Sequence, residues 1–264
     1  MRLPLNRLAP LAIFPLLCGP LPLPAQTVHP AGSGSSSSNP AVLVELFTSE
    51  GCSSCPPADA LLRQINGTRT GSGQLIVGIS EHVTYWNNLG WSDPYSADTY
   101  TARQNAYSDR FRLGGVYTPQ MVINGAEQII GSDKNSLERA LAQESSRPQI
   151  PLHILSANIA GSVLNVTFTA GSNTSHEAAE IMAVLADDVD RSSVFRGENS
   201  GRTLAHVAVA RSLARIATVH GATEKTVQLP LPASFDTGKG SHHLILFAQS
   251  ASLGPVLGTD SKPI

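Results

Sequence analysis

The sequence has little charge and no clusters of like charge. Asp, Glu, Lys and Arg make up 14% of its 264 residues, and the formal net charge is −2. This balance lacks the basic footprint of a nucleic-acid-binding protein, and no run of Lys and Arg indicates a membrane surface. Three cysteines are too few for a disulfide scaffold. A hydrophobic content of 41% is nevertheless enough for a packed core, so a folded protein is expected.

Residues 1–25 have the pattern of a secretory signal peptide. Arg2 and Arg7 form a short basic start, residues 8–17 are almost wholly apolar, and Ala25 offers a small residue for cleavage. A transmembrane anchor would need about 20 apolar residues, whereas prolines interrupt this stretch repeatedly. We therefore expect an exported protein, periplasmic or secreted, without a stable membrane span in its mature chain.

A lipoprotein with an acylated Cys18 is a weaker alternative, because Leu17 precedes the cysteine where such sites have a small residue. Residues 26–40 are rich in Gly and Ser, a composition typical of a flexible linker. The folded part is expected to begin at Ala41.

Residues 41–147 show strands alternating with helices. Apolar runs predict strands at 41–47, 75–79, 120–123 and 127–130, and periodic apolar residues predict helices at 58–65, 97–112 and from Ser132 or Asp133 onward. Helices between the early strands imply a parallel core, and Asn124-Gly125 predicts a hairpin that adds an antiparallel edge. The expectation is an α/β domain with a mixed sheet and flanking helices.

Residues 151–264 follow a different pattern. Predicted strands recur about every ten residues, at 163–169, 181–186, 204–210, 213–219, 227–231 and 243–248. Such spacing predicts an all-β, immunoglobulin-like sandwich. Since it has no cysteine and no convincing acid–base set, we expect this second domain to bind or scaffold.

The strongest candidates for a reactive site are Cys52 and Cys55, which lie between a predicted strand and a predicted helix. A structural disulfide is one interpretation. A zinc site is another, but it would need a second ligand pair, and no other cysteine follows the signal peptide. The third is a redox dithiol, in which the helix N-terminus stabilises an exposed Cys52 thiolate and a buried Cys55 resolves the mixed disulfide.

These features resemble the thioredoxin superfamily: a strand that ends at Phe47, a Cys-Ser-Ser-Cys sequence that opens a helix, and Thr118-Pro119 before a hairpin. The resemblance implies a thioredoxin-like domain at 41–147. It also implies a cis Thr118–Pro119 bond that faces the cysteines beside the substrate backbone.

A closer resemblance covers most of the mature chain. The stretches Val44–Asp59, His82–Trp91, Tyr117–Val122 and Gly197–Arg202 are similar to the exported bacterial family catalogued as domain-of-unknown-function family 1223. Because that family has no settled activity, the likeness implies fold and export rather than a reaction. Within the last stretch, Glu198 and Arg202 are expected to fix a turn.

Four further residues are candidates for the site. Glu45 is either a buried carboxylate that takes the proton of Cys55 or a strand-end acid that lies in solvent or pairs with an arginine. Tyr85 and Trp86 lie in an aromatic segment just past a strand end, where they would contact a substrate. His82, in the same segment, would bind substrate, polarise the thiolate or serve only as a hydrogen-bonded structural residue.

Together these residues predict an exported thiol–disulfide oxidoreductase-like protein. It would need no cofactor, and its partner would be a protein or a small thiol or disulfide. Two alternatives stay open. One is a Cu(I) carrier that uses Cys52, Cys55 and His82 as ligands. The other is a binding module whose disulfide is structural.

Overall fold

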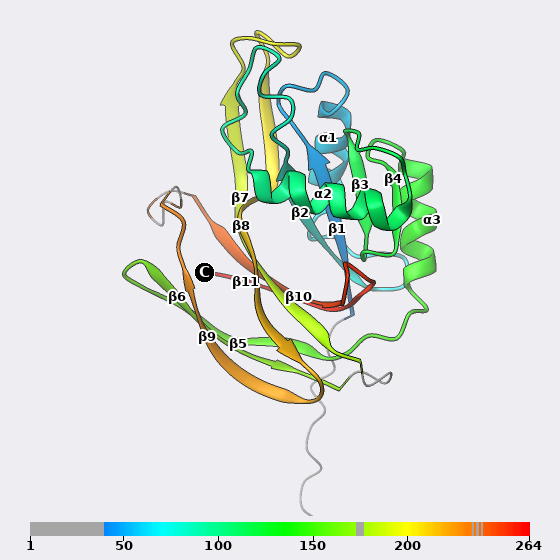
Figure 1. Cartoon of the computed structure of the whole chain (residues 1–264), viewed down its shortest axis with the longest axis vertical. Helices are drawn as coiled ribbons and strands as arrows, with labels where there is room; N and C mark the ends of the chain where they lie inside the picture. The colour runs from blue at the N-terminus through cyan, green and yellow to red at the C-terminus, as the bar shows by residue number, and fades with distance from the viewer. Residues whose placement is uncertain (1–39, 173–176, 234, 236–237, 239) are drawn as a thin grey trace, which may run out of the picture. The chain divides into compact units, whose positions relative to one another are not determined.

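The computed structural model describes residues 40–172, 177–233, 235, 238 and 240–264. The expected signal peptide and the expected linker up to residue 39 lie outside this range. In the described part of the chain, three helices and eleven strands follow one another (Figure 1). They are β1 (Ala41–Thr48), α1 (Pro56–Ile65), β2 (Leu75–His82), α2 (Asp98–Phe111), β3 (Gln120–Ile123), β4 (Glu127–Ile130), α3 (Lys134–Glu144), β5 (Leu152–Ala160), β6 (Val163–Ala170), β7 (Ala179–Ser193), β8 (Thr203–Val219), β9 (Thr223–Pro230), β10 (His242–Ser250) and β11 (Val256–Pro263).

The elements predicted between residues 41 and 147 are confirmed. Helix α1 starts with two prolines, which are tolerated there because the first N–H groups of a helix have no partner within it. Asp133 caps α3 by accepting a hydrogen bond from the Ser136 backbone N–H at 3.1 Å. None of the helices in the described ranges is long and apolar enough to cross a membrane.

The predicted fold class is wrong. Strands from both halves of the chain form one eight-stranded mixed sheet in the order β11-β10-β7-β8-β2-β1-β3-β4 (Figure 1). The two halves join where β2 runs parallel to β8, with Ser80 opposite Val209. A thioredoxin-like domain followed by a separate immunoglobulin-like sandwich is therefore not what this sequence forms. Alternating polarity reveals strands but not which strands pair, so it could not show this junction.

The two strands predicted at 204–210 and 213–219 are one long strand, β8. Its pairing with β7 shifts register between Leu185 and Ala186, where Arg211 is the extra residue on β8. Such a bulge interrupts the alternation of apolar and polar side chains. The predicted break thus corresponds to a bulge within a continuous strand.

A second sheet, in the order β5-β6-β9, packs against the half of the large sheet formed by β7 and β10. Alternate residues of these strands fill the core between them, among them Phe168, Ile181 and Leu246. The β-rich half of the chain therefore has two layers, and one of them is part of the sheet that also carries the cysteine-bearing segment.

The two faces of β1 have different neighbours. Val42, Val44 and Leu46 pack with α1 and α3, whereas Leu43 and Phe47 face a core that includes the aromatic side chains of α2. Successive side chains of a strand point to opposite faces. Glu45 therefore points toward α2 and away from α1. This placement decides its role below.

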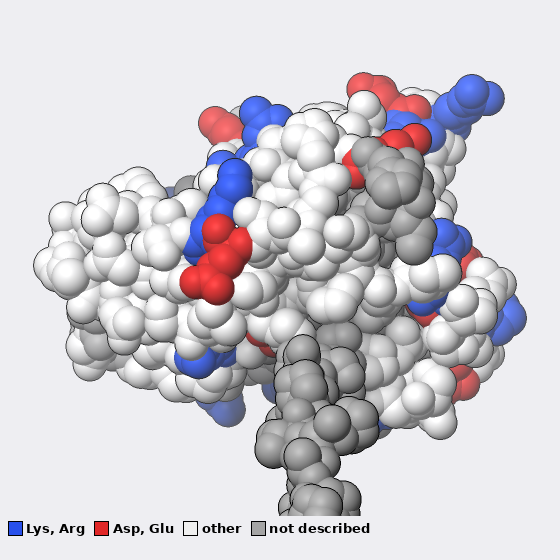
Figure 2. All heavy atoms as spheres, turned by 90° about the horizontal axis from the view of Figure 1, so that it is seen from below, with Lys and Arg blue, Asp and Glu red and all other residues white. Residues whose placement is uncertain are grey.

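Charged residues are sparse on the face shown in Figure 2, where small groups of adjacent positive and negative residues lie between wide uncharged areas. This distribution agrees with the low charge content of the sequence.

Candidate functional site

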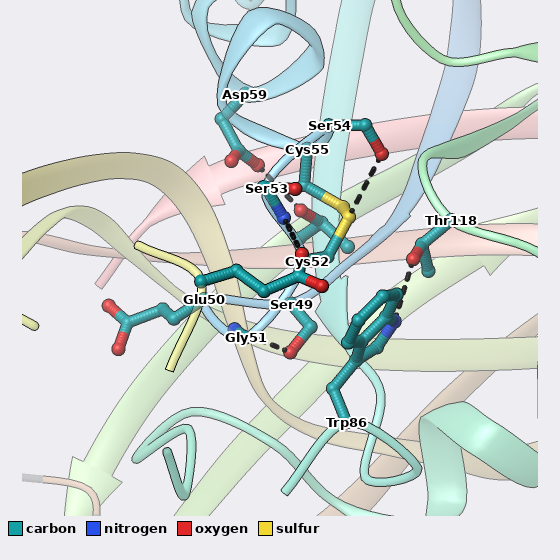
Figure 3. The surroundings of a disulfide bond; sticks show 12 residues. Ser49, Glu50, Gly51, Cys52, Ser53, Ser54, Cys55, Asp59, Trp86 and Thr118 are labelled. Atoms are coloured by element: carbon teal, nitrogen blue, oxygen red, sulfur yellow. Dashed lines mark hydrogen bonds between the residues drawn. A yellow bond between two sulfur atoms is a disulfide. The ribbon is translucent and has the colours of Figure 1, made fainter. Parts of the chain in front are cut away.

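Cys52 and Cys55 form a disulfide with an S–S distance of 2.12 Å (Figure 3). Cys55 is the N-cap residue of α1, so the disulfide lies at the amino end of this helix. Both residues are fully buried. The expected exposure of Cys52 is therefore absent in the disulfide form.

The Thr118–Pro119 bond is cis, as predicted. Because β3 runs antiparallel to β1, with Gln120 opposite Phe47, the residues just before β3 lie beside the loop that follows β1. The Trp86 indole Nε1–H donates to Thr118 Oγ1 at 2.8 Å, and Figure 3 shows this pair next to the disulfide. Trp86 and Thr118 thus form one wall of the site.

The loop between β1 and the cysteines fits closely against Trp86. A Cβ atom at Gly51 would lie 3.0 Å from the Trp86 Cβ, so a larger residue would push the indole away. On the other side, Ser54 Oγ lies 3.4 Å from Cys52 Sγ. The buried sulfur of Cys52 therefore has a hydroxyl within hydrogen-bonding distance.

Two of the three predicted substrate-binding residues, Tyr85 and Trp86, lie together with their ring centroids 6.5 Å apart, and the third, His82, belongs to another group. Trp86 lies at the disulfide, but Tyr85 donates its hydroxyl to Gln104 Oε1 at 3.2 Å and packs near α2. Burial raises the pKa of Tyr85. His82 is fully buried, and its Nδ1 lies 2.7 Å from Asp93 Oδ2. Trp86 and Tyr85 thus lie beside Thr118, whereas His82 occupies the buried, hydrogen-bonded place of a structural histidine.

Glu45 belongs to a different group of residues. Its carboxylate accepts from Arg103 Nε at 2.5 Å and from the Tyr107 hydroxyl at 2.8 Å, both on α2. Burial acts to lower the pKa of Arg103, but Glu45, Tyr107 and Glu81 outweigh it and raise that pKa. Burial and the nearby Glu45 raise the pKa of Glu81 well above its usual range. Glu45 is thus fixed by α2 rather than directed at the sulfurs.

The loop between β7 and β8 holds the cysteine segment in place. Asn199 Nδ2 donates to the backbone carbonyls of Glu50 and Cys52, both at 2.9 Å. The Ser53 backbone N–H donates to Glu198 Oε2 at 2.9 Å and, with the Ser53 side chain, lowers the pKa of this carboxyl. Arg202 in turn donates to Asn199 Oδ1 at 2.8 Å.

Sequence reasoning missed these contacts. It expected Glu198 and Arg202 only to fix a turn, and it singled out nothing at Asn199. The available signal was the stretch Gly197–Arg202 itself, two glycines and four polar residues that resemble the same family as the cysteine segment. What the sequence could not show is that the loop folds back over the cysteines.

A second missed group lies beside the first turn of α1. Glu50 is fully buried and accepts from Trp91 Nε1 at 2.8 Å and from the Ser192 hydroxyl. His206, on β8, places its Nε2 3.3 Å from Glu50 Oε1. Among the described residues, no group of three or more His, Cys, Asp or Glu is arranged to hold a metal ion.

Comparison with known proteins identifies relatives but no activity. A family model described as "Protein of unknown function (DUF1223)" matches residues 43–249. The X-ray structure of a protein from Agrobacterium tumefaciens is similar, with 28% identity, a TM-score of 0.63, and coverage of 83% of this chain and 92% of that one. HBP35 of Porphyromonas gingivalis shares the fold at 14% identity, with a TM-score of 0.61 and coverage of 86% and 76%. No curated protein matches.

Proposed function

We propose that this chain, which belongs to the DUF1223 family of proteins of unknown function, exchanges disulfides with a protein or a small thiol through Cys52 and Cys55. The proposal rests on the position of the disulfide. Its two cysteines are only three residues apart in the sequence, and they lie at the amino end of α1.

The short span argues against a purely stabilising role. Closing a loop of a few residues contributes about 2 kcal/mol by chain entropy, against about 3 kcal/mol for a 15-residue loop. Hydrogen bonds donated by Asn199 and accepted by Glu198 already hold the same segment. The position at the positive end of a helix, in contrast, favours the thiolate that exchange requires.

The proposed reaction has two exchange steps. A partner thiolate attacks Cys52 Sγ, the bond to Cys55 Sγ breaks, and its electron pair leaves on Cys55. A second partner thiolate then attacks the partner's sulfur in the mixed disulfide, which forms the partner disulfide and releases Cys52. The partner is oxidised, and the protons of its two thiols end on the two cysteines. Since Cys52 is buried, the first attack requires its surroundings to open, and we expect Trp86 and Thr118, which lie beside the disulfide, to move aside (Figure 3).

The burial of both sulfurs favours one competing interpretation, a structural brace. A structural and an exchanging disulfide differ in reduction potential. The potential of a structural disulfide typically lies below about −300 mV, and that of an exchanging disulfide lies above it. We expect the Cys52–Cys55 pair to equilibrate above that value in dithiothreitol or glutathione buffers, as followed by thiol alkylation and mass spectrometry. If the disulfide of the folded protein stays oxidised at about −300 mV, its role is structural and the proposed exchange is wrong.

The direction of attack has its own test. A C55S variant should accumulate mixed disulfides with oxidised glutathione through Cys52, whereas C52S should accumulate far fewer. Equal trapping by both variants would reject Cys52 as the attacked sulfur.

We propose further that the protein acts outside the cytoplasm, as residues 1–25 suggest. Expression of the full chain in a bacterium, followed by fractionation and intact-mass measurement, should yield a shortened periplasmic or secreted form that begins near residue 26. Retention of an intact amino terminus in the cytoplasm would contradict export.

A further inference from the structure

Five buried ionisable side chains gather beside the first turn of α1. They are Glu50, Asp59, His82, Asp93 and His206, each at most 5% exposed. They come from the loop after β1, from α1, from β2, from the loop before α2 and from β8. Buried charges are costly unless they are paired, so a cluster of this size next to a disulfide calls for an explanation.

His206 is the centre of the cluster. Its Nε2 lies 3.3 Å from Glu50 Oε1, and its Nδ1 lies 3.7 Å from Asp59 Oδ1. Within the described residues this Nδ1 has no hydrogen-bond partner. The distance to Asp59 is an ion-pair distance that a small side-chain rotation would shorten to a hydrogen bond.

The remaining groups that face His206 come from three other segments. The His82 ring meets it edge-on at 4.6 Å, and the Tyr95 ring lies 5.7 Å away. Asp190 lies opposite His206 on β7. Burial and Asp187 raise the pKa of Asp190, while His206 acts to lower it. His82 itself is directed toward Asp93, so its contact with His206 is through the ring.

These surroundings keep His206 charged. Burial acts to lower its pKa, but the neighbouring carboxylates of Asp59 and Glu50 outweigh burial and raise that pKa to about 9. Glu50 already accepts from Trp91 and Ser192. Asp59 has the Thr48 hydroxyl, at 2.9 Å, as its hydrogen-bond donor.

Asp59 connects His206 with the disulfide. It follows Cys55 by four residues on α1, and residues four apart share one face of a helix. Figure 3 shows its carboxylate pointing back toward the level of Cys55. Glu50, in contrast, is directed to β7 and β8 through Ser192 and His206.

We propose that Asp59 and His206 form a proton-transfer pair for the sulfur of Cys55, with His206 acting through Asp59. This inference rests on the proposed disulfide exchange. When a partner thiolate attacks Cys52 Sγ, the S–S electron pair leaves on Cys55 Sγ as a buried thiolate. The Asp59 carboxylate passes a proton from His206 to that sulfur, so Cys55 becomes a neutral thiol and His206 becomes neutral. Ionisation of the partner's second thiol supplies the replacement proton.

The test is the pH profile of disulfide reduction by dithiothreitol in the full mature chain, with each rate divided by the thiolate fraction of the reagent. The wild-type rate should stay level at neutral pH and fall as His206 loses its proton near pH 9. H206Q and D59N should each be about 100-fold slower at pH 7, the lower end of the range for a lost acid–base group, and should lack the fall.

Two further variants separate this role from a structural one. H153Q is the matched control, because His153 on β5 also has a buried ring nitrogen that lacks a partner among the described residues, yet it lies in the other sheet. It should keep the wild-type profile. E50Q should move the fall to lower pH, since it removes one of the two carboxylates that keep His206 charged.

The outcomes are distinct. If the folded wild type is not reduced at all, the proposed function fails and this pair with it. If the wild type is reduced and folded H206Q, D59N and E50Q keep its rate and profile, the exchange stands and the proton-transfer pair is wrong. If H206Q or D59N does not fold, the direction of the E50Q shift decides.

Discussion

The two buried charge clusters of this protein differ in what they can do. Under α2, Glu45 and Glu81 surround Arg103. Beside α1, Glu50 and Asp59 surround His206. An arginine stays protonated at any relevant pH, so the first cluster can fix side chains but cannot pass a proton. A histidine titrates, so the second can. A buried acid that is close to a dithiol in the sequence can therefore be assigned a role in proton transfer only when its cationic partner is known.

The largest expected effect belongs to the arginine cluster. Arg103→Met leaves Glu45 buried without its cation, which should lower the free energy of unfolding by about 3–5 kcal/mol in urea titrations. The double variant E45Q/R103M should recover part of this loss, because it removes the unpaired charge. The reduction rate of the folded fraction should not change. A slowed reduction in stable, folded R103M would place Glu45 back among the residues that serve the sulfurs.

The second effect is a pH dependence that belongs to the histidine cluster. Folding raises the pKa of His206 from 6.5 to about 9, so its stabilisation is complete below pH 6.5 and is lost as the pH rises through 9. The loss should approach about 3 kcal/mol, at 1.36 kcal/mol per pKa unit. Urea titrations of the wild type at pH 6, 7.5 and 9 should show this decline relative to H206Q. Parallel curves for the two proteins would mean that His206 is neutral in the folded state.

The sequence predicted the local parts of this molecule well. The strand before the cysteines, the helix after them and the cis bond at Pro119 are set by short-range patterns, and all are present. Trp86 was also predicted at the site, where it meets Thr118.

Long-range placement was where the predictions failed. For Glu45 the sequence left two roles open, proton acceptor for Cys55 or structural acid, and the alternation of β1 decides for the second by directing it to Arg103 on the α2 face. Asn199 and His206 lie about 150 residues beyond the cysteines and reach them only because β8 joins β2. No local pattern encodes that single junction, so the stretch Gly197–Arg202 could be recognised in the sequence but its contact with the cysteine segment could not, and nothing indicated the place of His206 beside Glu50 and Asp59.

A smaller effect should follow from releasing the loop between β7 and β8. Asn199→Ala removes one hydrogen bond each from the carbonyls of Glu50 and Cys52, of which only Cys52 keeps another backbone donor, Cys55, and this should cost about 1–3 kcal/mol of unfolding free energy. It should also speed reduction of the disulfide, because the segment that carries Cys52 is less firmly held. Ser200→Ala, which removes only an exposed bond to the Phe195 carbonyl, is the control. An equal effect of both variants would mean that the loop does not restrain the cysteines.

The smallest effect concerns the wall over the sulfurs. Thr118→Val keeps the shape of the side chain but removes the acceptor of the Trp86 indole N–H, a bond worth about 1 kcal/mol net. If that bond must break before a thiolate reaches Cys52, its loss should raise the rate of reduction by dithiothreitol about fivefold, at 1.36 kcal/mol per tenfold. Thr167→Val, which removes a hydroxyl contact with Thr226 in the three-stranded sheet, should leave the rate unchanged. Stopped-flow measurements at pH 7 compare the two variants directly. An unchanged rate in T118V would place the access route away from Trp86, most simply on the side held by Asn199 and Glu198, and N199A would then be the faster variant of the two.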